Sequence, residues 1–84
     1  MEEDISSNMG FIMGNKQRER VVQILGSKGK MAPEKIAKIE HMPLPTVKRI
    51  LEELGGRKIA AEDGGSWGLT EQGQALEKEM KKRV

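Results

Sequence analysis

The chain has 84 residues, 15 of them Lys or Arg and 13 Asp or Glu, and its formal net charge is +2. This length suits one small domain, and the absence of cysteine excludes disulfide bonds, thiolate catalysis and cysteine-ligated zinc. No apolar run approaches the ~18 residues of a membrane-spanning helix, and the acidic start is unlike a signal peptide, so we expect a soluble, cytoplasmic protein without membrane contact.

The charges are unevenly distributed along the chain. Residues 15–58 hold 11 basic and five acidic side chains, whereas residues 1–14 and 59–74 are net acidic. A basic middle creates a local field that attracts an anion such as the phosphate backbone of a nucleic acid. The alternative is a solvated, charged helix surface, which explains most Lys- and Arg-rich helices.

The first 14 residues combine acidic side chains with two glycines and the short apolar cluster MGFIM. The segment suits a flexible arm, and it equally suits a short element whose Phe11, Ile12 and Met13 form a dimer contact. We therefore separate residues 1–14, as an N-terminal arm, from a domain that spans residues 15–84.

Two helices are predicted after this arm. Asn15 is a suitable N-cap for the segment KQRERVVQIL, which the glycines of GSKGK at residues 26–30 then end. The second helix lies in MAPEKIAKIEHM and has Pro33 in its first turn. The residues expected to face the core are Val21, Val22 and Leu25 in the first helix and Ile36, Ala37 and Ile39 in the second.

The third predicted helix follows a short break at HMPLP and begins at Pro45. Its buried stripe repeats at i, i+3, i+4 and i+7, and Gly55 and Gly56 end it. The stripe consists of Val47, Ile50, Leu51 and Leu54. On the exposed side, the i, i+4 spacing predicts ion pairs between Lys48 and Glu52 and between Arg49 and Glu53.

The period then changes from helical to alternating. Residues 59–62 and 66–69 are expected to pair as two short strands around an Asp63-Gly64-Gly65 turn. Thr70 is a suitable cap for a last helix, EQGQALEKEMKKR, whose closing basic residues, including Arg83, suit the negative end of its dipole. The expected fold class is mainly α with a small β-hairpin (α+β), in the order helix, helix, helix, hairpin, helix.

Three stretches together resemble the winged helix-turn-helix domain of small archaeal and bacterial transcriptional regulators of the ArsR and MarR type. RERVVQIL resembles the first helix of that family, and IAK followed by LPTVKRILEEL resembles its helix-turn-helix. WGLTEQG resembles the exit from the hairpin, called the wing, into the last helix. The likeness covers roughly residues 16–80 and rests on the order and spacing of the three motifs.

The resemblance implies a three-helix core, a two-stranded wing, a C-terminal helix, and a recognition helix at residues 45–54 that enters the DNA major groove. It places base or phosphate contacts in the first part of that helix and phosphate contacts around it. The implied DNA-binding residues are Pro45, Thr46, Lys48 and Arg49 on the helix, with Lys30, Lys35, Arg57 and Lys58 around it.

The chain departs from the family pattern at four places. The family usually has Gly in the tight turn, where this chain has His41, and Ser or Thr as the N-cap of the recognition helix, where it has Pro43. A Gly-Leu pair commonly precedes the wing strand, and here that pair is Lys58-Ile59. The wing tip EDGGS is acidic at a place where a phosphate contact requires Arg or Lys.

Other distinctive residues are expected to serve the fold. The single His41 lacks the companions that a metal site needs and suits a turn with an unusual backbone angle. Trp67 is expected to pack against the third helix. The methionines expected to fill the core are Met9, Met13, Met31, Met42 and Met80. No serine, carboxylate or glycine pattern indicates catalysis, so we expect no catalytic, metal or cofactor site and no evident small-molecule ligand.

The sequence therefore predicts a sequence-specific regulator of transcription that binds double-stranded DNA. We expect it to act as a homodimer that forms through the N-terminal segment, the C-terminal helix or both. The alternative is a winged-helix protein-interaction module within a larger assembly, which the acidic wing and the apolar MGFIM cluster favour. RNA binding is a weaker alternative because Phe11 and Trp67 are the only aromatic residues available to stack on bases.

Overall fold

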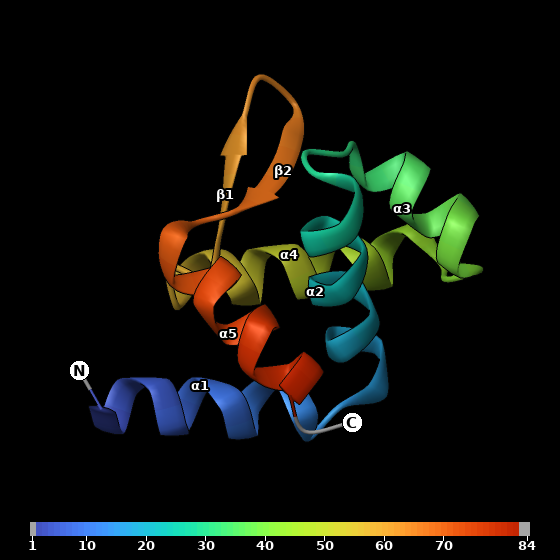
Figure 1. Ribbon diagram of the computed structural model, residues 1–84. Coiled ribbons are helices and arrows are strands. Elements are labelled where there is room, and N and C mark those ends of the chain that lie inside the picture. The colour runs from blue at the N-terminus through green and yellow to red at the C-terminus, as the bar shows by residue number, and fades with distance from the viewer. Residues whose placement is uncertain (1, 83–84) are drawn as a thin grey trace.

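The computed structural model describes residues 2–82, with side chains from Ser7 onward, and Arg83 lies outside the described residues. Within this range the chain forms five helices and one antiparallel hairpin (Figure 1), which agrees with the predicted α+β class. In chain order these elements are α1 (Glu2–Met13), α2 (Lys16–Lys28), α3 (Pro33–Glu40), α4 (Leu44–Gly56), β1 (Ala60–Asp63), β2 (Ser66–Leu69) and α5 (Glu71–Lys82).

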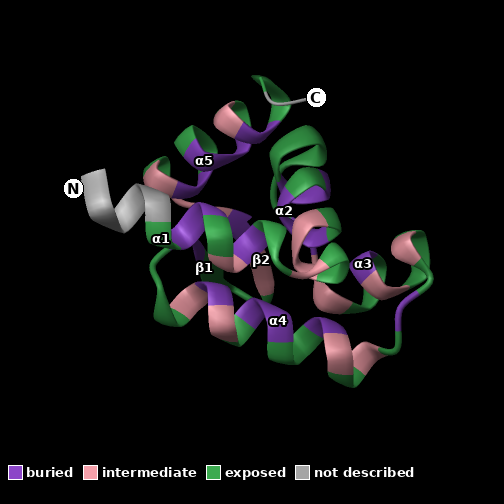
Figure 2. Ribbon diagram, turned by 90° about the horizontal axis from the view of Figure 1, so that it is seen from below, coloured by how far each residue is buried: buried purple, intermediate pink, exposed green. Residues whose placement is uncertain are grey.

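The helices enclose one apolar core. The predicted stripe of α4 is buried throughout, and Figure 2 shows buried and exposed residues alternating along this helix. Ile36 of α3 is buried as predicted, whereas Ile39 was wrongly assigned to the core and is 41 % exposed. The residues with no measurable exposure are Ile12, Val21, Val22, Ile36, Val47, Leu51, Leu54 and Ile59. Figure 1 places the hairpin and α1 at opposite ends of the molecule, with α2, α4 and α5 between them.

The N-terminal segment forms helix α1 and contributes to this core. Met9 and Ile12 are buried, and α1 contacts both α2 and α5. Of the apolar side chains that we considered for a dimer contact, Ile12 is therefore used inside the chain. Met13, expected in the core with the other methionines, is 41 % exposed, while Met9, Met31, Met42 and Met80 are buried.

One helix end agrees with the prediction and one differs from it. Helix α2 ends at Lys28, where Gly29 caps it with a φ of 83°, so the predicted stop within GSKGK is confirmed. Gly55 and Gly56 were predicted to end the third helix, but both are still helical, and α4 is capped by Arg57.

The hairpin pairs Ala60–Asp63 with Ser66–Leu69 around the two left-handed glycines of its turn. A third segment joins it, because Met31 and Trp67 exchange backbone N–H···O bonds of 2.8 and 2.9 Å. The indole of Trp67 lies so close to Gly55 that a Cβ there would be 3.2 Å from Cζ3. The predicted packing of Trp67 against the third helix is thereby confirmed.

None of the helices in residues 2–82 combines the length and the apolar character that crossing a membrane requires.

Candidate nucleic-acid interface

Helix α4 begins without a capping side chain. Its N-cap is Pro43, which has no side-chain oxygen, and its first turn contains no acidic residue. The first backbone hydrogen bond of the helix runs from Val47 N–H to Pro43 O at 3.1 Å. The N–H groups of Leu44 and Thr46 come before it and therefore have no acceptor within the helix. No side chain of the first turn therefore compensates the positive end of the helix dipole.

Lys48 and Arg49 are both exposed on α4, directly behind this open end. Among the side chains of residues 7–82, neither of them forms an ion pair, so the predicted pairs with Glu52 and Glu53 are absent. Glu53 instead accepts a bond from Arg18 Nε of helix α2 at 3.2 Å. The front half of α4 thus carries two cations that no described acidic side chain neutralises.

The rear end of α4 is different, because Glu53 is paired with α2 and the capping Arg57 contacts α1. The guanidinium carbons of Arg18 and Arg57 lie 3.9 and 4.0 Å from the centre of the Phe11 ring. Arg18 Nη1 also donates to Phe11 O at 3.1 Å, and Arg57 Nη1 donates to Asn8 Oδ1 at 3.1 Å. These four residues, Asn8, Phe11, Arg18 and Arg57, form what we call the arginine stack.

The structure therefore does not bring Arg57, a predicted DNA-binding residue, to the front of α4. Its guanidinium lies over Phe11, where it holds α1 against the end of α4. Sequence reasoning missed this arrangement because Asn8 and Arg57 are 49 positions apart, and Arg18 and Glu53 are 35 apart. No local pattern links residues at such separations.

Lys30, another predicted phosphate contact, lies beside the hairpin tip. Its Nζ is 2.6 Å from Asp63 Oδ2, and both side chains are mostly exposed. The hydrogen bond from Lys30, with the attraction of its charge, lowers the pKa of Asp63 below the usual value for this side chain. The charge of Asp63, one of the two acidic residues at the hairpin tip, is thus compensated within the chain, while Glu62 stays exposed.

The two remaining predicted cations occupy different places. Lys35 is exposed on the first turn of α3, which packs against α4. Lys58 lies in the turn between α4 and β1, beyond the rear end of α4, and has a left-handed φ of 63°. The other non-glycine residue with a positive φ among residues 2–82 is His41, at 56°, which confirms its predicted role as a turn residue.

No family model matches the chain, and neither the curated proteins nor the solved structures contain a match to it. A functional assignment therefore rests on the contacts and charges of the chain itself.

Proposed function

We propose that this chain is a winged helix-turn-helix domain and a sequence-specific regulator of transcription that binds double-stranded DNA with the front half of α4. The observation that carries the proposal is the pairing of Glu53 with Arg18 at 3.2 Å. This contact removes the acid that the helix spacing would place beside Arg49. The chain thereby keeps a cationic, uncapped helix start on its surface.

Two departures from the family pattern support the winged-helix assignment. His41 and Lys58 occupy positions where the resembling family usually has Gly, and both have left-handed backbones, with φ of 56° and 63°. Glycine adopts this conformation without strain, whereas other residues do so at a cost of about 1–2 kcal/mol. Both positions thus have the conformation that glycine favours, and this agreement supports the proposal.

The chemistry of the exposed face of α4 suits the major groove, which admits one helix. The planar guanidinium of Arg49 has the geometry to donate two hydrogen bonds to guanine or to a phosphate. The open amides of Leu44 and Thr46 suit a phosphate at the groove edge, and Lys35 and Lys48 suit the flanking backbone. Glu52, exposed farther along α4, would then lie toward the outside of the groove.

The hairpin has a secondary role in this proposal. An exposed ion pair such as Lys30–Asp63 contributes about 0–1 kcal/mol, so Lys30 can leave Asp63 and bind a DNA phosphate at little cost in free energy. The uncompensated Glu62 disfavours a closer approach of the tip. The two features that favoured a protein-interaction module are weakened as well, because Asp63 is paired and Ile12 of MGFIM is buried.

The proposal is tested by selecting bound sequences from a random pool of DNA duplexes and titrating the recovered site at several salt concentrations. With three phosphate contacts, the logarithm of the binding constant should fall with the logarithm of salt at a slope of about −3. In a second selection, Arg49→Ala should relax the preference at one base pair, whereas Lys30→Ala should weaken all sequences alike.

An absence of binding at low salt would overturn the proposal and leave the protein-interaction module as the better assignment. Binding to single-stranded RNA in preference to the duplex would overturn it too. The homodimer stays a prediction, which sedimentation of the chain with and without the selected duplex will measure.

A further inference from the structure

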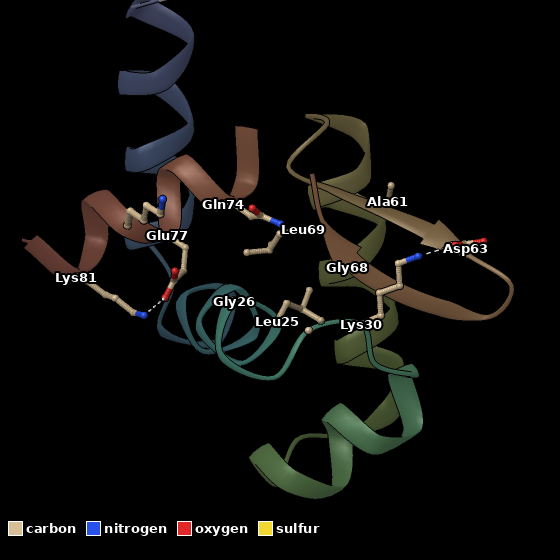
Figure 3. Close-up of a pocket in the computed structure, with 12 residues that line it drawn as sticks. Leu25, Gly26, Lys30, Ala61, Asp63, Gly68, Leu69, Gln74, Glu77 and Lys81 are labelled. Atoms are coloured by element: carbon tan, nitrogen blue, oxygen red, sulfur yellow. Dashed lines mark hydrogen bonds and ion pairs between the residues drawn. The ribbon is translucent and has the colours of Figure 1, made fainter. Parts of the chain in front are cut away.

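A groove of about 650 Å³ lies between the end of α2, one face of the hairpin and α5 (Figure 3), on residues that the proposed DNA contact does not use, apart from Lys30. Its volume falls within the ~300–1,000 Å³ of small-molecule sites. Leu25 and Leu69 give it an apolar part, Gly26 and Gly68 leave its walls without side chains, and Gln74, Glu77, Lys78 and Lys81 supply polar groups along α5.

Glu77 is the unusual member of this lining. The residue is only 5 % exposed, although its side chain carries a carboxylate. It lies across Gly26 so closely that a Cβ on that glycine would be 2.6 Å from Glu77 Cδ and 2.7 Å from Cγ. This contact explains why a glycine stands inside helix α2, where alanine would favour the helix by about 0.5–1 kcal/mol.

The carboxylate of Glu77 is incompletely satisfied within residues 7–82. Lys81 Nζ lies 3.2 Å from Oε2 (Figure 3), but outside hydrogen-bond geometry, so this buried oxygen accepts no hydrogen bond from the described side chains or backbone. A buried acceptor without a donor costs about 1–3 kcal/mol, more when it is charged. An ordinary helix-surface pair avoids this cost because water reaches both partners, as it does at Glu79–Lys82, where both side chains are at least 46 % exposed.

The other charges around the groove indicate which kind of ligand could bring a hydrogen-bond donor to Glu77. Lys30 is paired with Asp63 at one end, while Lys78 and Lys81 outnumber Glu77 at the other. This end therefore offers one acceptor for a cationic donor and surplus positive charge for an anion, next to the apolar surface of Leu25 and Leu69. We propose that the groove binds a free amino acid with an apolar side chain, whose ammonium donates to Glu77 and whose carboxylate meets Lys78 and Lys81.

The test is a titration of the isotope-labelled chain with L-leucine and L-methionine, followed by amide NMR in the absence of DNA. We expect saturable shifts at Gly26, Gly29 and Gly68. Isoamylamine, which lacks the carboxylate, and 4-methylpentanoate, which lacks the ammonium, should each bind at least about tenfold more weakly than leucine, because each loses one charge-assisted contact.

Glu77→Gln keeps the shape of the side chain and removes its charge, and it should weaken leucine binding at least about tenfold. Glu79→Gln is the matched control, because this residue lies on the same helix but does not line the groove. If Glu77→Gln does not fold, the single variants Lys78→Gln and Lys81→Gln replace it, and both should weaken binding.

The proposal is overturned if neither amino acid gives saturable shifts up to about 20 mM, well above the ~1 mM dissociation constant of a weak site. It is also overturned if leucine binds Glu77→Gln, or both lysine variants, as tightly as the unmodified chain. Since no DNA is present, these outcomes are independent of the proposed DNA-binding function.

Discussion

The front half of helix α4 carries two basic side chains, whereas its rear half carries two acidic ones and is capped by Arg57. At the front, Lys48 and Arg49 have no acidic partner among the described side chains. At the rear, Glu53 holds Arg18, and Arg57 lies on Phe11 and donates to Asn8. The role of a basic residue therefore follows from its neighbours in space. A count of Lys and Arg along the chain would treat Arg49 and Arg57 alike.

The two halves are also connected. Glu53 is on the same helix as Arg49, one turn later, and it is Arg18 of α2 that draws Glu53 away. Arg18 in turn is positioned by the ring and the carbonyl oxygen of Phe11 in α1. Helix α1 thus supports the rear of α4 directly and keeps the front cationic indirectly.

The largest expected effect comes from removing the core contact of α1. Ile12 has no measurable exposure, so Ile12→Ala should lower the free energy of unfolding by about 3 kcal/mol through lost burial and a cavity. Met13→Ala, at the neighbouring and 41 % exposed position, should change it by less than about 0.5 kcal/mol. Urea unfolding followed by circular dichroism measures both. Equal, small effects would mean that α1 is a detached arm.

The next largest effect is expected at Arg18. Arg18→Gln removes the bond to Glu53, the bond to Phe11 O and the stacking on the Phe11 ring. The loss of these partly buried interactions should lower the free energy of unfolding by about 1–2 kcal/mol. It should also weaken binding of the selected duplex about twofold, because Glu53 then becomes free to pair with Arg49.

The second part of this prediction has its own control. In the double variant Arg18→Gln, Glu53→Gln, the affinity for DNA should return to that of the unmodified chain, while the stability stays low. If the double variant binds as weakly as Arg18→Gln alone, Glu53 does not couple the two halves of α4.

A smaller effect of opposite sign is expected just beyond the rear end of α4. Lys58 has a φ of 63°, so Lys58→Gly should relieve strain and raise the free energy of unfolding by about 0.5–1 kcal/mol. Arg57→Gly, at a φ of −98°, should lower it, because this position has no such strain and loses the arginine stack. Thermal unfolding distinguishes them. A destabilising Lys58→Gly would show that the Lys58 side chain makes a contact that outweighs the strain.

The smallest effect concerns the hairpin. Lys30 lowers the pKa of Asp63, so the ion pair contributes above the unfolded pKa of about 3.9 and is lost as the pH falls through the lower, folded pKa. A carboxyl NMR titration should give Asp63 a midpoint below that value. Lys30→Gln should move the midpoint up toward it, and an unchanged midpoint would contradict the pairing.

Local patterns predicted most of the elements because local spacing encodes them. The stripe of α4, the cap at Asn15, the hairpin turn and the packing of Trp67 all follow from short stretches of sequence. Helix α1 was not predicted, because its glycines and serines favour a helix only weakly and its place in the core depends on distant helices. Ile39 was assigned to the core from the helical spacing of apolar residues alone. In the eight-residue helix α3, however, Ile36 faces the core and Ile39 is exposed.

The candidate site was predictable in its front half and not in its rear half. Pro45, Thr46, Lys48 and Arg49 form one local stretch, so their shared surface is readable from the sequence. The partners of Arg57, Lys30 and Glu53 come from other elements and decide which charges remain free. The same holds for Glu77, which looks like an ordinary helix-surface residue until Gly26 is seen beneath it.

The most direct test of the account compares Arg49→Gln with Arg57→Gln, each measured by duplex titration across salt and by urea unfolding. Arg49→Gln should weaken binding of the selected duplex at least about tenfold and relax the preference at one base pair, with the salt slope and the stability nearly unchanged. Arg57→Gln should lose about 1 kcal/mol of stability and keep both affinity and slope. Equal losses of affinity, or a larger loss at Arg57, would contradict the division of α4 into a DNA-binding front and a structural rear.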